Sequence, residues 1–147
     1  MKWIDIPPVW LLAHLGAVWL LAPYLPLGFG FAWVGVFGTL LLIGGLSLML
    51  MAVYEMHRAK TTPIPHMQPS ALVSSGVFGL SRNPIYLGDA LILAGVVLRA
   101  DAPLLLVLVP VFMWIIARRF ISAEEGRLRS AFGAAFEDYS QKTRRWL

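Results

Sequence analysis

Hydrophobic residues occur in long uninterrupted blocks along this chain, with short polar stretches between them. No Asp, Glu, Lys or Arg occurs between Ile6 and Tyr54. Because a membrane-spanning helix needs ~20 mainly apolar residues, this block predicts two spans, residues 9–25 and 29–54, joined by a turn of prolines and glycines. The second span is rich in small residues, which let membrane helices approach closely: Gly35, Gly38, Gly44, Gly45 and Ser47.

The same pattern returns after a polar, proline-containing segment, residues 55–79. Residues 84–98 and 104–121 are mainly apolar, and a tight polar turn joins them. We therefore expect a helical hairpin, whose first helix is only ~22 Å long by helical rise. Pro110 predicts a kink in the second helix.

The last part of the chain, residues 123–146, is amphipathic rather than uniformly apolar. Its apolar residues recur at helical spacing: Leu128, Phe132, Phe136 and Tyr139. Gly133 is expected to weaken or kink this helix. Two interpretations stay open, an interfacial helix lying on anionic lipid or a lid that packs over a site built from the hairpin.

The composition points to a membrane protein. Of the 147 residues, 59% are hydrophobic and 14% charged, against ~25% charged in soluble domains. We predict a single all-α domain, an integral membrane helical bundle of about four transmembrane helices. Its expected parts are two N-terminal spans (1–54), a cytoplasmic loop (55–83), the C-terminal helical hairpin (84–121) and an amphipathic cytoplasmic segment (122–147).

Basic residues set the expected orientation. With four spans, both termini and the polar loop share one side, which then holds every Lys and Arg except Arg99. The positive-inside rule places that side in the cytoplasm. The net charge of +4 is then explained by basic residues gathered at the membrane edge, and we expect no nucleic-acid partner. Trp3 and Trp10, close to Lys2, are expected to lie among the lipid head groups.

Residues 80–88 form a polar hinge that opens the third predicted span. Asn83 is a good N-cap whose side-chain oxygen is expected to accept from the backbone N–H of Tyr86. Pro84 then occupies the first helical position, where a missing N–H costs nothing. The helix start beside Arg82 favours a bound anion or carboxylate. The alternative is a capped helix with a snorkelling arginine.

Few other residues suggest chemistry. The chain has no cysteine, no histidine pair at metal-ligand spacing and no Ser-His-Asp order typical of a hydrolase. His14, inside the first span, is best explained as a satisfied core histidine, and His57 and His66 lie on other elements. A polar set remains: Arg82, Asn83, Tyr86, Asp89, Glu124, Glu125, Arg127 and Tyr139.

The acidic members of this set allow more than one reading. Asp89 lies close to the membrane, so it should be paired, and Arg82 is a possible partner. Glu124 and Glu125 either neutralise nearby arginines at the lipid surface or accept from the hydroxyls or ammonium of a polar ligand.

Two ordered motifs make the sequence similar to a known family. The first comprises Thr61-Thr62-Pro63, Pro69-Ser70-Ala71-Leu72-Val73-Ser74-Ser75-Gly76 and Ser81-Arg82-Asn83-Pro84-Ile85-Tyr86-Leu87-Gly88. The second comprises Glu124-Glu125, Leu128, Phe132-Gly133, Phe136, Tyr139 and Arg145-Trp146. Together they resemble the isoprenylcysteine carboxyl methyltransferase and phospholipid methyltransferase superfamily, from about Thr61 to Trp146.

The resemblance implies a fold and an activity. In that family the last two membrane helices form a hairpin and the C-terminal segment folds over S-adenosylmethionine. It implies a membrane S-adenosylmethionine-dependent methyltransferase, needing no metal, whose partners are membrane lipids and a lipid-like or small hydrophobic acceptor. The acceptor group, a carboxylate, thiol or amine, stays open.

The resemblance also implies roles for individual residues. The residues expected to be catalytic are Arg82, Tyr86 and Glu125. Those expected to bind the cofactor are Asn83, Pro84, Leu87, Gly88, Glu124, Glu125 and Tyr139. Two positions depart from the family pattern. Asn83 stands where eukaryotic prenylcysteine enzymes usually have histidine, and Phe136 where the family often has tyrosine. Asparagine is common in bacterial relatives with varied acceptors, so we expect a bacterial inner-membrane location.

The expected chemistry suits these residues. Methyl transfer from a sulfonium is an in-line displacement, which mainly requires donor and acceptor to be held close. Arg82 would orient a carboxylate or thiolate acceptor, whereas an amine must lose a proton to Asp89, Glu124 or Glu125. Two other classes remain: a non-catalytic helical scaffold or partner subunit, and a small transporter using His14 and Asp89, for which no inverted repeat is visible.

Overall fold

The computed structural model describes residues 5–25, 28–61 and 70–147. Throughout these ranges the chain is helical or irregular, with no strand, so the predicted all-α class is confirmed. Predictions for Lys2, Trp3, Pro26, His66 and the first motif's residues 62–69 fall outside the described residues. The α-helices are α1 (Pro7–Leu21), α2 (Ala32–Arg58), α3 (Pro84–Arg99), α4 (Leu108–Ile116), α5 (Ser122–Phe132) and α6 (Ala134–Lys142).

Two stretches are long and apolar enough to cross a membrane. They are α2, Ala32–Arg58, and the continuous helical stretch Pro103–Phe132. By contrast, α1 has 15 residues and α3 has 16. At helical rise these are ~22–24 Å long, less than the ~30 Å of the hydrocarbon core. Four complete spans therefore stay a prediction.

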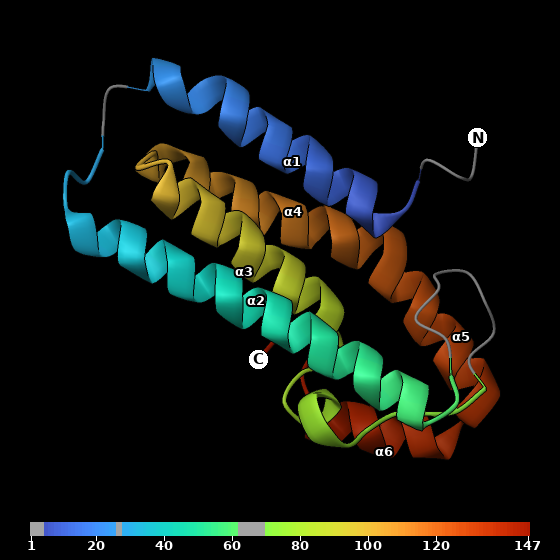
Figure 1. Ribbon diagram of the computed structural model, residues 1–147. Helices are drawn as coiled ribbons and strands as arrows, with labels where there is room; N and C mark the ends of the chain where they lie inside the picture. Colours follow the sequence, from blue (N-terminus) through green and yellow to red (C-terminus); the bar gives the residue numbers. More distant parts are fainter. Residues whose placement is uncertain (1–4, 26–27, 62–69) are drawn as a thin grey trace.

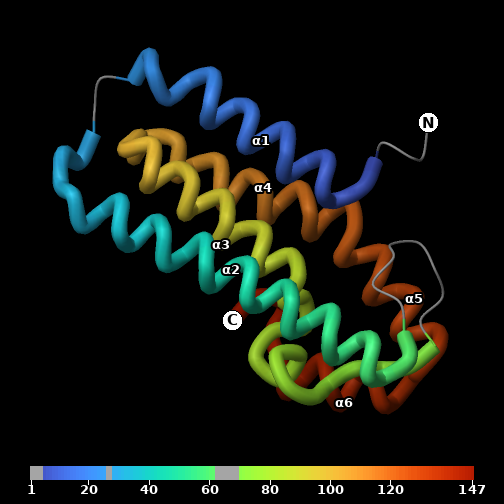
Figure 2. The backbone as a smooth tube through the Cα atoms, viewed as in Figure 1, coloured from blue at the N-terminus to red at the C-terminus, as the bar shows by residue number. Residues whose placement is uncertain are grey.

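The four apolar helices lie lengthwise beside one another, as Figures 1 and 2 show. α2 packs along α3, α1 contacts both α3 and α4, and α3 contacts α4. α5 and α6 lie together at one end of this bundle. The main core cluster fills the space between α1, α3 and the α4 region: Val18, Tyr86, Ala90, Leu93, Val97, Ala102, Leu105, Phe112, Ile116, Phe120 and Ile121.

Glycines bring α2 and α3 into backbone contact. Gly38 lies against Gly95, and Gly45 against Gly88. A Cβ added at any of the four would lie 2.6–2.7 Å from the partner's carbonyl oxygen, which is closer than real Cβ atoms come. Of the small residues predicted to mediate packing, Gly38 and Gly45 do so, whereas Gly44 faces open space. This contact fixes the axis of α3, the helix that carries the hinge.

The helix from Pro103 to Phe132 changes type three times. It begins as a 3₁₀ turn, Pro103–Val107, continues as α4, and passes through a π-helical turn, Ala117–Ile121, into α5. The π turn was not predicted. Such turns are rare and frequently lie at functional sites. The kink expected at Pro110 stays a prediction.

The C-terminal amphipathic segment is two helices rather than one. α5 ends at Phe132 and α6 begins at Ala134, because Gly133 has φ +49° and ψ −121°. Only glycine adopts such a conformation readily. The expected weakening at Gly133 is thus a complete break, and α6 turns back to pack under the hinge. The helix also ends at Lys142, so residues 143–147 are not helical.

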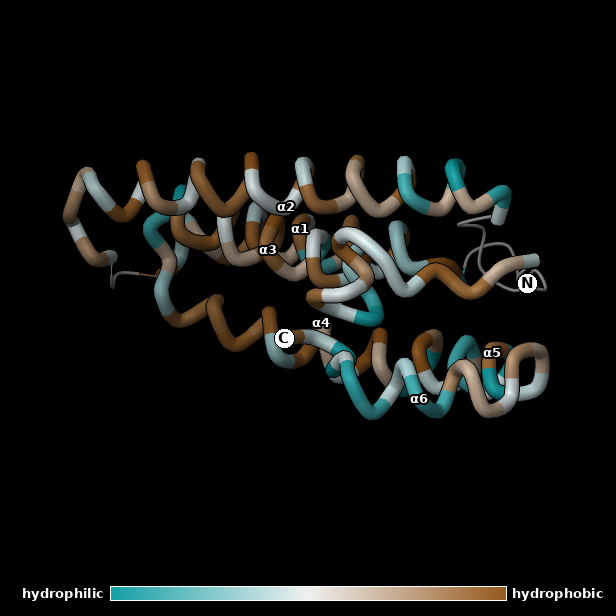
Figure 3. The backbone as a smooth tube through the Cα atoms, turned by 90° about the horizontal axis from the view of Figure 1, so that it is seen from below, coloured by the Kyte–Doolittle hydropathy of each residue, from teal (hydrophilic) through white to brown (hydrophobic). Residues whose placement is uncertain are grey.

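Polar residues divide between the two ends of the bundle. In Figure 3 the hydrophilic segments gather in α5, α6 and the last turns of α2. At the opposite end, Asp101 accepts hydrogen bonds from the backbone N–H groups of Phe29 and Gly30, at 2.8 and 3.1 Å. Arg99 there donates to Thr39 at 2.6 Å. These contacts tie the α1–α2 connection to the α3–α4 turn.

Candidate functional site

The hinge before α3 is bound by the C-terminal end of the chain. Pro84 is the first residue of α3, as predicted. Asn83 precedes it but makes no side-chain cap, so the predicted bond to Tyr86 N–H is wrong. Its Nδ2 instead donates to the carbonyl oxygen of Arg145 at 3.0 Å. An acceptor 62 residues away therefore engages this side chain in place of a local cap.

Two neighbouring bonds continue this contact. The backbone N–H of Arg82 donates to the carbonyl oxygen of Arg144 at 2.9 Å. The hydroxyl of Ser81, which is 1% exposed, donates to the carbonyl oxygen of Arg145 at 3.0 Å. We call residues 143–146 the C-terminal strap, because their main chain lies along the hinge and fixes it.

Glu125 of α5 lies between two arginines. It forms a double hydrogen bond with Arg145, Nε to Oε1 at 2.9 Å and Nη2 to Oε2 at 2.7 Å. Nη2 of Arg82 lies 3.2 Å from Oε1 of the same carboxylate. Glu125 is 8% exposed, and its hydrogen bonds raise the pKa of Arg145. Arg82 thus pairs with Glu125, and the suggested pairing with Asp89 is wrong for the chain as described.

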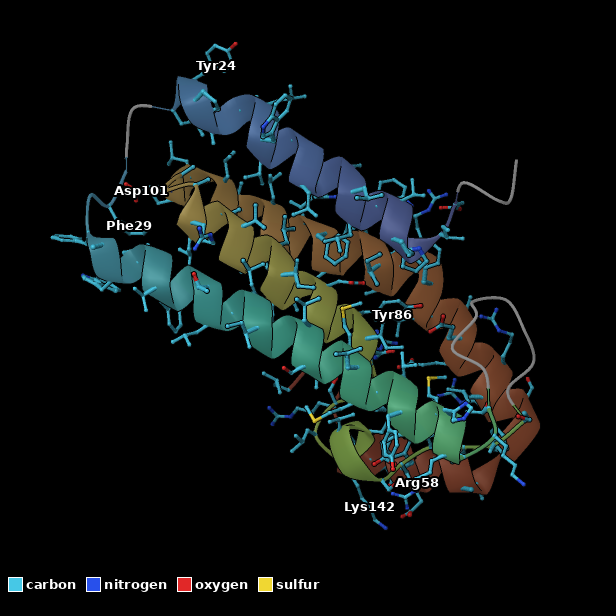
Figure 4. All side chains as sticks on the ribbon, viewed as in Figure 1. Tyr24, Phe29, Arg58, Tyr86, Asp101 and Lys142 are labelled. Atoms are coloured by element: carbon cyan, nitrogen blue, oxygen red, sulfur yellow. The ribbon has the colours of Figure 1, made fainter. Side chains whose placement is uncertain are left out.

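A second polar cluster adjoins the first. The hydroxyl of Tyr86 donates to Oε1 of Glu124 at 2.6 Å. The charges of Asp89, one turn further along α3, and of Arg127 also act at this hydroxyl. Asp89 is 4% exposed. Figure 4 shows Tyr86 where α3 meets the α4–α5 stretch, at a distance from Asp101 at the other end.

Beside this cluster lies an open hollow on α5 of about 580 Å³. Small and polar residues line it: Ala123, Gly126, Arg127, Ser130 and Ala131. Glu124, which accepts from Tyr86, and the residues that line the hollow lie on the same helix, α5.

Tyr139 of α6 packs against the turn that precedes the hinge. Its hydroxyl donates to the carbonyl oxygen of Phe78 at 2.6 Å, and burial raises the pKa of Tyr139 to about 12. Phe136 packs on the same side, 6.0 Å below the guanidinium of Arg82. Together they join α6 to the turn before the hinge and to Ala52 of α2. A role for Tyr139 in cofactor binding stays a prediction.

The remaining predicted site residues serve packing in this structure. Pro84 and Leu87 are buried in the first turn of α3, and Gly88 contacts α2 through its backbone. Their assignment to cofactor binding stays a prediction. His14 agrees with its prediction, since Nδ1 donates to the carbonyl oxygen of Trp10 at 2.8 Å.

Comparison with known families decides the class of protein. A family model described as phospholipid methyltransferase matches residues 33–135, more than two thirds of the chain. The chain belongs to the phospholipid methyltransferase family. The resemblance inferred from the two motifs is therefore confirmed. No curated protein and no solved structure matches the chain.

The match covers most of the site of this phospholipid methyltransferase family member. It includes the hinge, α3 and the Glu124–Glu125 pair, and it ends at residue 135. Tyr139 and Arg145 lie beyond it. Membership of this family and two helices able to span a bilayer indicate a membrane methyltransferase.

Sequence reasoning missed two residues of the site. Ser81 belongs to the first motif but was given no role, yet its burial and its bond to the strap make it part of the hinge. Arg145 was noted only as part of the tail motif, with no role. One signal in the sequence could have indicated a role for Arg145: it is an arginine in the same motif as Glu124 and Glu125.

Proposed function

We propose that this protein is an integral membrane S-adenosylmethionine-dependent methyltransferase acting on a lipid-like acceptor. One observation carries the proposal. The two motifs meet in space, with Tyr86 bound to Glu124 at 2.6 Å and Arg82 paired with Glu125 at 3.2 Å. Each glutamate of the second motif thus engages one side chain of the first, in a chain of the phospholipid methyltransferase family.

The charges present fit such a cofactor. Within the described residues, Nε of Arg82 is buried and has no hydrogen-bond partner, so a donor is available for an anionic oxygen. Two guanidinium groups around one carboxylate leave a net positive charge, and the N-terminus of α3 adds a positive dipole end. This cluster suits the carboxylate of S-adenosylmethionine. The acidic cluster at Tyr86 and Glu124 suits the cationic groups of S-adenosylmethionine.

When bound, S-adenosylmethionine supplies an electrophilic methyl group on a sulfonium. The protein must hold the acceptor in line with that group and exclude water, which is chiefly a proximity effect. Arg82 is placed to orient an anionic group of either ligand by charge-assisted hydrogen bonds. Phe136 beneath it and Glu125 beside it restrict its side chain.

The acidic groups favour an amine as the acceptor. An ammonium must lose a proton before its nitrogen lone pair can attack, and a carboxylate within reach can accept that proton. Glu124, bonded to Tyr86, and the buried Asp89 are both placed at this cluster. The apolar outer surface of α2 and α4 faces the bilayer, so a lipid acceptor would enter sideways while the cofactor enters from water.

Calorimetry tests the cofactor assignment. S-Adenosylhomocysteine, the demethylated product, should bind the purified protein, and Glu124→Ala and Glu125→Ala should each bind it more weakly with helical content unchanged by circular dichroism. Glu137→Ala is the matched control, because Glu137 is half-exposed and pairs with Arg129, not with a residue of the hinge. Wild-type affinity in both test variants, or no binding by the wild type as a non-catalytic scaffold would show, refutes the assignment.

The acceptor requires a separate experiment. Membranes that contain the protein should be incubated with methyl-labelled cofactor, and the labelled product identified by mass spectrometry. Label in the head-group amine of a lipid is the expected result.

A further inference from the structure

Arg145 is the residue of the strap that contacts both halves of the site. Its carbonyl oxygen accepts from Ser81 and from Asn83, each at 3.0 Å. Its guanidinium holds the carboxylate of Glu125 by two hydrogen bonds, at 2.9 and 2.7 Å. The backbone of one residue is thus fixed to the hinge while its side chain is fixed to α5.

The double hydrogen bond determines how Glu125 faces Arg82. The terminal torsion of a glutamate is broad, so a single contact leaves the carboxylate free to turn. Pairing with the planar fork of Arg145 fixes its plane and leaves Oε1 3.2 Å from Nη2 of Arg82. Arg145 also supplies the second positive charge of the cluster.

We propose that Arg145 is a positioning residue, which orients Glu125 and through it Arg82 for ligand binding. The identity of the ligand rests on the proposed function, whereas the contacts among Arg145, Glu125 and Arg82 do not. Arg145 lies outside the stretch that matches the phospholipid methyltransferase family, residues 33–135. The contacts of Arg145 with Ser81, Asn83 and Glu125 therefore assign this role, which the family match does not.

The neighbouring Arg144 provides a matched control. It is the same residue type, one position earlier, and its side chain is exposed. It contributes a carbonyl oxygen, which accepts from the N–H of Arg82, and Arg144→Ala keeps that group. A difference between Arg145→Ala and Arg144→Ala reports the guanidinium of Arg145 and not the presence of the strap.

The first experiment measures positioning without a ligand. Hydrogen exchange of the peptide that contains the hinge is followed in detergent for five proteins: the wild type, Arg144→Ala, Arg145→Ala, Glu125→Gln and the Glu125→Gln, Arg145→Ala double variant. We expect ~10-fold faster exchange in each single variant at Arg145 and Glu125, no further gain in the double variant, and no change in Arg144→Ala.

The second experiment measures S-adenosylhomocysteine binding by the same proteins. Loss of hydrogen bonds between charged groups should weaken binding ~10-fold or more in Arg145→Ala. Arg145→Lys should not restore it, since lysine lacks the fork. Millimolar guanidinium ion should restore part of it, because the side chain of Arg145 is 42% exposed and the vacated place is open to solvent. The double variant should bind no more weakly than Glu125→Gln.

The outcomes separate the two proposals. Wild-type affinity in Arg145→Ala, or losses that multiply in the double variant, overturns the positioning role. Absence of binding by the wild type overturns the proposed function instead. Hydrogen exchange alone then decides whether Arg145 positions Glu125, and equal exchange in Arg144→Ala and Arg145→Ala refutes that role.

Discussion

Replacing Arg82 by lysine gives the sharpest test of what the hinge does. The substitution keeps a positive charge on a long stem beside Glu125, and the pair lies 3.2 Å apart in the wild type. It removes the planar guanidinium, whose Nε is buried without a partner in the described chain. Lysine can keep the ion pair but cannot offer two donors in one plane.

The expected loss follows from these contacts. Because the charge and the stem stay, and because an ammonium still lies over the ring of Phe136, we expect folding and most cofactor affinity to remain. One charge-assisted hydrogen bond to the reacting groups is lost, worth ~1.5–3 kcal/mol. Activity should therefore fall by ~10-fold or more.

The assay is methyl transfer to the acceptor once the labelling experiment has identified it, with kcat and KM measured separately. Arg118→Lys is the control, because Arg118 is exposed in the π-helical turn and should be interfacial only. A fall in kcat confined to Arg82→Lys supports a role in the transition state. Equal activity in the two variants refutes the reasoning, and the catalytic group would then be sought nearer Glu124 and Asp89.

Three further predictions concern the fold. Gly45→Ala should lower the free energy of unfolding by ~1 kcal/mol, because overpacking costs ~1–3 kcal/mol against a helix-propensity gain of ~1 kcal/mol. Gly44→Ala should be neutral or stabilising. Thermal unfolding in detergent compares the two variants, and equal shifts in their melting temperatures would contradict the backbone contact. Tyr139→Phe should cost ~1 kcal/mol at neutral pH. The pKa of Tyr139 is raised to about 12, so its contribution to the stability of the wild type is complete below pH ~10 and is lost as the pH rises toward 12. The Tyr139→Phe variant should lack this fall in stability between pH ~10 and 12. Cysteines at Ala100 and Lys142 test the orientation with impermeant reagents on intact cells: labelling at 100 and protection at 142 are expected, and the reverse pattern would overturn it.

Much of the fold could be predicted because it depends on one-dimensional properties. The length of an apolar block determines where a membrane helix can form, and α2 follows its block closely. Pro84 determines the start of α3 because its ring fits the first helical position. The helix-type change at Ala117–Ile121 has no such local signature, since none of its five residues is a proline or glycine that would interrupt the helix.

The site was less predictable, because its partners are far apart in the sequence. Asn83 has the chemistry of an N-cap, and only the position of the strap shows that Arg145 engages its amide. From the sequence, Arg82 could have paired with any of three carboxylates: Asp89, Glu124 or Glu125. The choice depends on the path of α5 after the π-helical turn, which local sequence does not determine.

The position of the candidate site at one end of the bundle has a consequence for the membrane itself. Arg82, Glu124 and Glu125 lie at one end of the bundle, and Asp101 marks the other. A charged head group crosses the hydrocarbon core only at a large energetic cost. If the acceptor is a lipid, as proposed, the methylated product would therefore accumulate in a single leaflet, and the two leaflets would differ in composition until a separate process carried the product across.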